Sequence, residues 1–217
     1  MGSYITSIGS EAAPYKIPQK QIFQFMARSL NLNESDAREL EILYRASGIN
    51  SRYSVLNDYG ANPDEYNFYP QNEHLNPFPT TADRMALYEE KAVGVMMDAV
   101  KNCMSKRPEI GPEDFTHLIT VSCTGMFAPG PDIQLVTKLG LKKSIKRTAI
   151  NFMGCYAAFN AIKAAKAFSL AEPGAKVLVV CAEFCSIHLQ KSVEPDHLLS
   201  AALFGDGAAA LIVESIP

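Results

Sequence analysis

Cys155 is the residue whose type and position are best suited to chemistry. Residues 148–152 have the composition of a strand, Gly154 allows a sharp turn, and residues 155–171 have the composition of a helix. Unpaired N–H groups and the dipole at the start of a helix favour an anion, and thiols placed there have pKa values of about 3.5–7.5 instead of about 8.5. The same N–H groups can bind an oxyanion during acyl transfer. The spacing therefore predicts a nucleophile that carries an acyl group.

A second interpretation of Cys155 stays open at this point. Cysteine is among the most frequently buried residue types. A single strand, glycine, cysteine and helix pattern does not separate a nucleophile from a small side chain in the core. The decision therefore depends on the elements and motifs around it.

The elements that would position Cys155 are predicted from the periodicity of apolar residues. Helices are expected at residues 19–30, 33–48, 81–105, 132–139 and 155–171. Strands are expected at residues 117–121, 148–152, 176–181 and 208–213. Strands separated by helices indicate an α/β fold with a largely parallel sheet and helices on its faces. Residues 57–79 show no period and are expected to form a long loop.

The helix that follows Cys155 is apolar around most of its circumference. Only Asn160, Lys163 and Lys166 form a narrow polar stripe. A helix of this kind is buried on most sides. Because one sheet can cover only one side, the sequence predicts a second layer from a partner chain or from a missing half of the fold.

The composition excludes several classes of function. The formal net charge of −3 provides no basic surplus for nucleic acid. We expect no membrane span, because no run of about 18 apolar residues occurs, and the amino terminus does not resemble a signal peptide. The five cysteines have no disulfide or metal-ligand spacing. These features predict a cytoplasmic protein with no metal site.

Four ordered stretches resemble one family. They are Cys123-Thr124-Gly125 with Ala128-Pro129-Gly130-Pro131-Asp132, Gly154-Cys155-Tyr156-Ala157, residues 176–183 and residues 203–213. Together they resemble the amino-terminal half of the type III polyketide synthases, the family of the chalcone synthases, which are similar to thiolases in fold. The resemblance implies one half of a thiolase-like layered fold, with a largely parallel mixed sheet and a buried nucleophile helix. It favours the nucleophile over the buried thiol at Cys155.

The resemblance also implies an activity. Cys155 would accept an acyl starter from a coenzyme A thioester, and decarboxylation of malonyl-coenzyme A would supply the carbanion that extends it. Such enzymes are acyltransferases that act as homodimers and need no metal or redox cofactor. Acyl-coenzyme A and malonyl-coenzyme A are therefore the expected small-molecule partners.

Four further site residues follow from the resemblance. Phe204 matches the family's gatekeeping aromatic residue, and Thr124, Cys185 and His188 match positions that line the substrate cavity. From the residues alone, Phe204 could equally be a core side chain before the Gly-Asp-Gly turn, and Asp206 would be a turn or capping residue.

The sequence departs from the family at the basic residues that hold coenzyme A phosphates in plant enzymes. These positions fall on Ala37, Ile42 and Ala46. Either Arg45 and Arg52 bind the phosphates, or the acyl donor is an acyl-carrier protein.

The resemblance treats residues 1–217 as one amino-terminal domain. The family's catalytic His and Asn belong to a carboxy-terminal half that is absent here. We therefore expect the isolated chain to have little or no condensing activity.

Two alternatives stay open. An initiating ketoacyl synthase or a hydroxymethylglutaryl-coenzyme A synthase has a similar arrangement of strand, cysteine and helix. A non-catalytic half-fold that serves as an interaction module would also preserve the scaffold.

Overall fold

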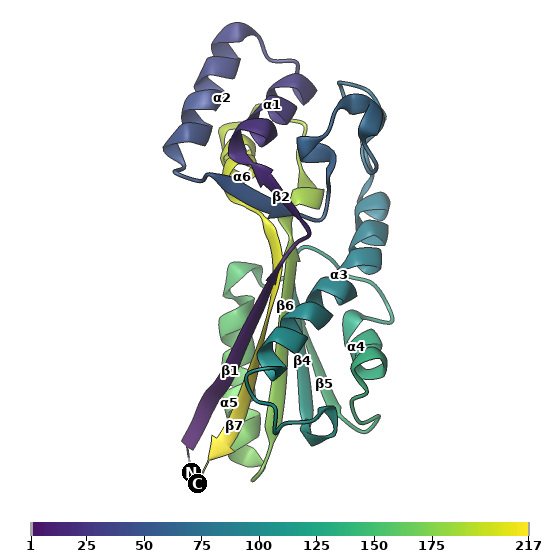
Figure 1. Ribbon diagram of the computed structural model, residues 1–217, viewed down its shortest axis with the longest axis vertical. Helices are drawn as coiled ribbons and strands as arrows, with labels where there is room; N and C mark the ends of the chain where they lie inside the picture. The colour runs from purple at the N-terminus through teal and green to yellow at the C-terminus, as the bar shows by residue number, and fades with distance from the viewer. Residues whose placement is uncertain (1, 217) are drawn as a thin grey trace. The chain divides into compact units, whose positions relative to one another are not determined.

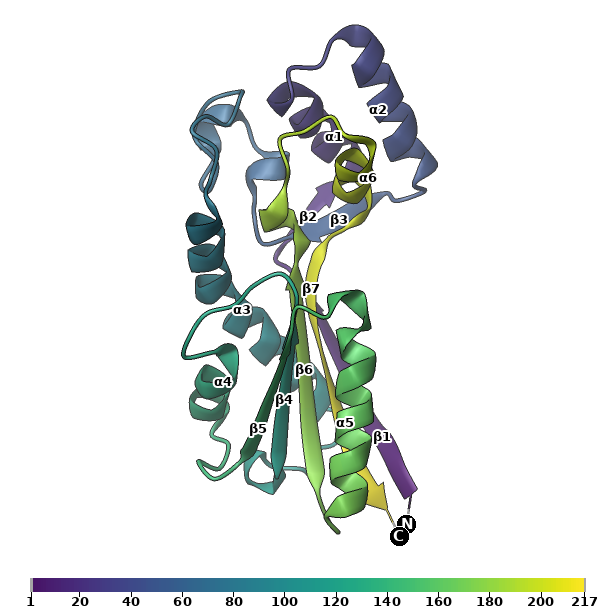
Figure 2. The same cartoon turned by 180° about the vertical axis from the view of Figure 1, so that it is seen from behind.

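The computed structural model describes residues 2–216, which divide into two compact units. The first unit comprises residues 2–12, 85–183 and 207–216, and the second comprises residues 13–84 and 184–206. Figure 1 and Figure 2 show the chain from opposite sides.

The first unit is built on a five-stranded sheet in the order β1-β7-β6-β4-β5. Its elements are β1 Gly2–Ala12, α3 Thr81–Met104, β4 His117–Ser122, α4 Pro131–Leu139, β5 Lys146–Asn151, α5 Ala157–Ala171, β6 Lys176–Phe184 and β7 Asp206–Ile216. Strand β4 pairs in parallel with β5 and β6, whereas β1 pairs antiparallel with β7. The α/β class and the mixed sheet expected from the sequence are confirmed.

Helices cover both faces of this sheet. Figure 2 shows α5 along one face and α3 with α4 along the other. Alternate residues of the strands supply the two cores because successive side chains point to opposite faces. Leu118, Leu178 and Val180 pack with α3 and α4, whereas Ile119 and Val179 pack with α5.

Helix α5 is buried on one side only. Ala157, Ala161 and Ala165 face the sheet, and Phe159 and Leu170 on the helix are exposed. One sheet therefore covers one side of α5, as the sequence predicts. In the described residues, the apolar residues on its other side have no second layer over them.

Strand β1 was not expected from the sequence. Its partner β7 lies at the other end of the chain, and a bulge between Ile5 and Ser7 interrupts its alternation. Gly9 lies directly against α3, because a Cβ atom there would be 2.2 Å from the backbone nitrogen of Cys103. Ser7 adds a hydrogen bond of 2.7 Å from its hydroxyl to the Cys103 carbonyl.

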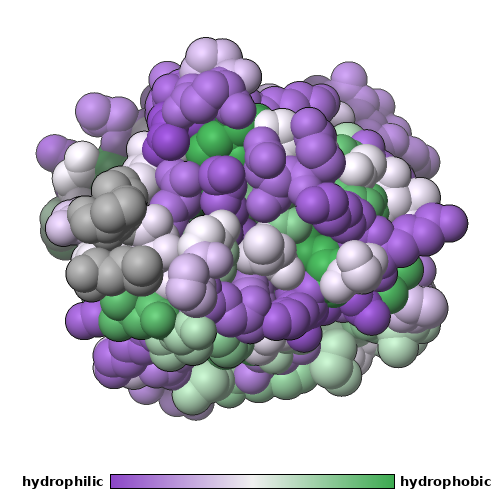
Figure 3. Space-filling view, turned by 90° about the horizontal axis from the view of Figure 1, so that it is seen from below, coloured by the Kyte–Doolittle hydropathy of each residue, from purple (hydrophilic) through white to green (hydrophobic). Residues whose placement is uncertain are grey.

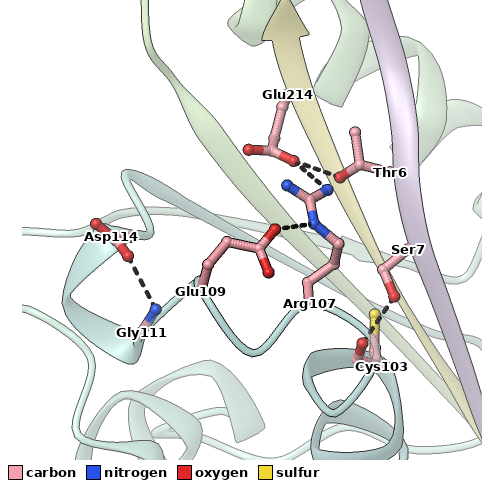
Figure 4. Close-up of polar contacts among 8 residues, drawn as sticks. All are labelled: Thr6, Ser7, Cys103, Arg107, Glu109, Gly111, Asp114 and Glu214. Carbon is pink, nitrogen blue, oxygen red and sulfur yellow. Dashed lines mark hydrogen bonds and ion pairs between the residues drawn. The ribbon is translucent and has the colours of Figure 1, made fainter.

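An ion-pair cluster fastens β1 and β7 to the segment after α3 (Figure 4). Arg107 donates from Nη1 to Glu214 at 2.9 Å and also pairs with Glu109. Thr6 of β1 donates to the same Glu214 carboxylate, which is nearly buried. The cluster therefore links three segments that are distant in sequence.

The second unit is mostly helical. Its elements are β2 Tyr15–Pro18, α1 Gln19–Ser29, α2 Glu34–Ala46, β3 Ser51–Ser54 and α6 Pro195–Leu203. Strands β2 and β3 pair antiparallel, and Asn33 caps α2 by accepting from the Asp36 N–H at 3.0 Å. The expected long loop has no long element: only 3₁₀ turns at Asp58–Gly60 and Pro63–Glu65 interrupt it. Sequence periodicity did not predict β2, β3 or α6.

No helix within residues 2–216 is both long and apolar enough to cross a bilayer. Figure 3 looks onto the end of the first unit where the parallel strands begin, and hydrophilic residues cover most of that surface. The candidate chemistry lies at the opposite end of the same strands.

Candidate functional site

Cys155 lies in a 3₁₀ turn, Gly154–Tyr156, that leads directly into α5. The first α-helical residue, Ala157, donates its N–H to the Gly154 carbonyl. Cys155 itself is exposed. The structure therefore confirms the position expected at the start of a helix, and the chemical role of the thiol stays a prediction.

The chain between β5 and Cys155 reverses through two left-handed residues. Phe152 has φ +57° and Gly154 has φ +66°. Glycine accepts this conformation without penalty, whereas a residue with a Cβ atom pays about 1–2 kcal/mol. A Cβ atom on Gly154 would meet nothing within 4 Å, so only the backbone angle requires glycine there. Phe152 adopts this strained conformation, and the residue is 62% exposed.

The turn after β4 lies beside the turn that carries Cys155. Ser122 and Asn151 are paired in the parallel register of β4 and β5, so the chain leaves both strands at the same edge of the sheet. The Cys123 thiol donates to the Gly154 carbonyl at 3.3 Å. Thr124, one of the predicted cavity residues, follows immediately and therefore belongs to the same edge.

Glu183, near the end of β6, holds the turn after β4. Its carboxylate accepts the N–H of Cys123 at 2.9 Å, and the N–H and hydroxyl of Thr124 at 3.0 and 2.6 Å. A carboxylate that binds two consecutive backbone N–H groups fixes the path of the chain between them. Sequence reasoning did not assign a role to Glu183, although an acidic residue that ends an apolar strand was a visible signal.

Gly125 and Tyr88 fix the next residue of this turn. A Cβ atom on Gly125 would lie 2.0 Å from the Tyr88 ring, so the ring occupies the space of a side chain. Tyr88 is fully buried in α3, and burial raises the pKa of its hydroxyl. The glycine of the Cys-Thr-Gly motif is therefore required by packing.

Cys181 differs from Cys155 in its surroundings. Burial, followed by the nearby charge of Glu183, raises the pKa of the Cys181 thiol to about 12. A thiol with that pKa stays protonated near neutral pH and is a poor nucleophile. Cys181 is therefore a structural thiol of the sheet.

The other three predicted site residues lie in the second unit. Cys185 and His188 begin and end a 3₁₀ turn, Cys185–His188, and both are half-buried. Phe204 follows α6 and is 49% exposed. The structure thus assigns the five predicted residues to two sets, with Cys155 and Thr124 in one unit and these three in the other.

Asp206 is more than the turn residue expected from the sequence. It is 7% exposed, and its carboxylate accepts the N–H groups of Val55 and Ser186, each at 2.8 Å. The Ser186 hydroxyl also donates to it. Burial raises the pKa of Asp206, and the hydrogen bonds from Ser186 and Val55 act in the opposite direction.

Among residues 2–216, no three His, Cys, Asp or Glu side chains are grouped as a metal site would require.

Comparison with known proteins gives a consistent family assignment. Residues 3–217 match the family model described as "Chalcone and stilbene synthases, N-terminal domain". The alpha-pyrone synthesis polyketide synthase-like Pks18 of Mycobacterium tuberculosis is 34% identical over 184 residues, covering 85% of this chain and 44% of that protein. Type III polyketide synthase A of Arabidopsis thaliana is 29% identical over 218 residues, covering 98% of this chain and 53% of that protein.

Comparison with solved structures gives the same family. The crystal structure of PKS-I from the brown alga Ectocarpus siliculosus superimposes with a TM-score of 0.91 and 29% identity. All of this chain is covered, but only 57% of that one. The thiolase-like fold is therefore confirmed, and the chain spans about half the length of the relatives that it matches.

Replacing Phe152 with glycine tests the strain at the turn before Cys155. The substitution removes about 1–2 kcal/mol of left-handed strain and adds about 0.5–1 kcal/mol of glycine entropy, so the free energy of unfolding should be unchanged or slightly higher. Phe159→Gly is the matched control, because Phe159 is exposed but helical and should cost about 0.5–1 kcal/mol. Urea denaturation measures both, and an equal loss in the two variants would contradict the assignment.

Removing the Glu183 carboxylate should destabilise the first unit. Glu183→Ala leaves the donors of Cys123 and Thr124 without their acceptor and should cost about 2–3 kcal/mol in urea unfolding. Glu183→Gln keeps one acceptor oxygen and should cost less than half as much. Glu89→Ala, at an exposed position of α3, is the control and should stay within about 0.5 kcal/mol. If Glu183→Ala behaves like this control, the carboxylate does not hold the turn.

Proposed function

The chain belongs to the chalcone and stilbene synthase family, and on that premise we propose that it forms the acyl-accepting part of a type III polyketide synthase. One observation carries the proposal: the exposed Cys155 thiol lies in the turn that opens α5. The relatives named as polyketide synthases support the same reaction class.

In the first step, the Cys155 thiolate attacks the carbonyl carbon of an acyl-coenzyme A. The carbon–sulfur bond to coenzyme A breaks, the coenzyme A thiolate leaves, and a thioester forms on the protein. Backbone N–H groups at the start of α5 are suited to stabilise both the attacking thiolate and the oxyanion that develops. Covalent attachment divides a difficult condensation into two easier steps.

In the second step, malonyl-coenzyme A loses carbon dioxide, and the resulting carbanion attacks the Cys155 thioester and expels the thiolate. This step needs donors that stabilise an enolate oxygen, each typically worth about 10²–10³ in rate. We assign them to the His and Asn of the family's carboxy-terminal half. The 217 residues alone should therefore show little or no condensing activity, although Cys155 can still accept an acyl group.

From the family resemblance, Thr124 of the first unit is proposed to bind the acyl substrate, and Phe204, Cys185 and His188 of the second unit are proposed to line the acyl cavity, with Phe204 as its gate. The enzyme acts as a homodimer and uses no metal or redox cofactor. Arg45 is exposed on α2 and is the better candidate for the phosphates of a coenzyme A donor. If an acyl-carrier protein acylates Cys155 and an acyl-coenzyme A does not, the acyl donor is the carrier protein.

Alkylation kinetics test the proposed nucleophile. Iodoacetamide should label Cys155 at about pH 6.5 faster than an ordinary exposed thiol, because the start of a helix favours the reactive anion. Peptide mapping by mass spectrometry separates Cys155 from the other four cysteines.

The matched control is the double variant Cys155→Ser with Glu89→Cys, which presents an exposed thiol in the interior of a helix. Labelling of Cys155 at the same rate as that control thiol would refute the activated nucleophile.

A further inference from the structure

The segment Phe204–Gly205–Asp206 is held along its backbone while the Phe204 ring stays half exposed. At one end, Arg52 of β3 donates from Nη1 to the Phe204 carbonyl at 2.6 Å. At the other, the Asp206 carboxylate accepts the Val55 N–H, from the residue just after β3, at 2.8 Å. The same short stretch of chain therefore fixes both ends of the segment.

Close packing fixes the residue between these two contacts. A Cβ atom on Gly205 would lie 3.2 Å from the Tyr53 carbonyl oxygen, which is tighter than ordinary contact. Gly205 thus runs closely past β3, and the backbone of the segment has little room to move.

Two of the three guanidinium nitrogens of Arg52 donate hydrogen bonds in this arrangement, whereas Nη2 is buried and has no hydrogen-bond partner among the described residues. Nε of Arg52 donates to Gln19 at 2.9 Å, and the Gln19 amide donates in turn to the Ala202 carbonyl of α6 at 2.7 Å. The guanidinium also lies over the ring of Tyr44, 5.8 Å from its centroid. Nε and Nη1 of Arg52 are thus directed at the protein itself, and phosphate binding by Arg52 stays a prediction.

Asp206 extends the arrangement to the predicted cavity residues. Besides Val55, it binds both the N–H and the hydroxyl of Ser186, which follows Cys185 and precedes His188 by two positions. One carboxylate therefore couples the Phe204 segment to the turn that carries Cys185 and His188. Burying a carboxylate costs free energy. A need to hold residues 204–206 in one conformation would explain the buried carboxylate of Asp206.

We propose that Arg52 and Asp206 are positioning residues of the acyl cavity, which hold Phe204 in one orientation relative to Cys185 and His188. This inference rests on the proposed function, in which these three residues line the cavity. In this role Arg52 and Asp206 act through Phe204 and not through contact with the substrate. They restrict the movement of Phe204, so that its fixed position helps to select among acyl groups.

Backbone order provides the first test. NMR relaxation of the Phe204 and Gly205 amides should give order parameters of about 0.85 in the parent chain, falling below about 0.6 in Arg52→Met and in Asp206→Asn. Arg52→Lys retains a donor for the Phe204 carbonyl and should restore most of the order. Arg38→Met and Asp196→Asn, at exposed positions of α2 and α6, are the controls and should leave it unchanged.

Selectivity provides the second test, because a purely structural role would not change it. The ratio of Cys155 acylation rates with long-chain and acetyl-coenzyme A should shift by roughly three- to tenfold in Arg52→Met and return in Arg52→Lys. Should Asp206→Asn fail to fold, the two Arg52 variants decide the question.

The outcomes separate the two proposals. If the parent is acylated but Arg52→Met alters neither order nor selectivity, the positioning role is overturned and the proposed function stands. A change in order without a change in selectivity also overturns it. If the parent chain is not acylated at all, the proposed function fails and the positioning role fails with it.

Discussion

The turns that follow β4 and β5 depend on the parallel register of these strands, and the Glu183 carboxylate fixes the first of them. Parallel strands release their chains at the same edge of a sheet, which is where α/β proteins place their ligands. The carboxylate binds two consecutive N–H groups and the Thr124 hydroxyl, and the Cys123 thiol then contacts the carbonyl just before Cys155. A change at the end of β6 should therefore reach the candidate nucleophile through one hydrogen-bonded turn. A mobile turn would lose that connection.

In the second unit, too, a carboxylate holds backbone segments by accepting their N–H groups. The buried carboxylate of Asp206 binds the backbone N–H groups of Val55 and Ser186, and Arg52 binds the carbonyl two residues earlier. In both units a buried or half-buried carboxylate accepts hydrogen bonds from backbone N–H groups of a turn in place of hydrogen bonds from water. Fully paired polar groups of this kind specify one local conformation, whereas partly paired ones would be costly. The two predicted sets of site residues therefore rest on similar internal supports, each within its own unit.

The parts of the structure that depend on neighbours in sequence could be predicted. The Asn33 cap, the long α3 and the position of Cys155 before α5 all follow from local spacing and periodicity. The supports of the site could not, because their partners are remote: Glu183 lies 60 positions from Cys123, and Asp206 lies 151 positions from Val55. Strand β1 was missed for the same reason, since β7 near the other end of the chain pairs with it. Local pattern can indicate a nucleophile, but not the side chains that hold its surroundings.

The open side of α5 agrees with a fold that continues beyond one sheet. Its outward Phe159 and Leu170 are exposed, as expected where a second layer belongs to other residues. The central claim, that Cys155 accepts an acyl group, can be measured without the condensation step. Intact-protein mass spectrometry after incubation with an acyl-coenzyme A should show one acyl adduct, mapped to the Cys155 peptide and absent from Cys155→Ser. No adduct on the parent chain, or an equal adduct on Cys155→Ser, would contradict the account.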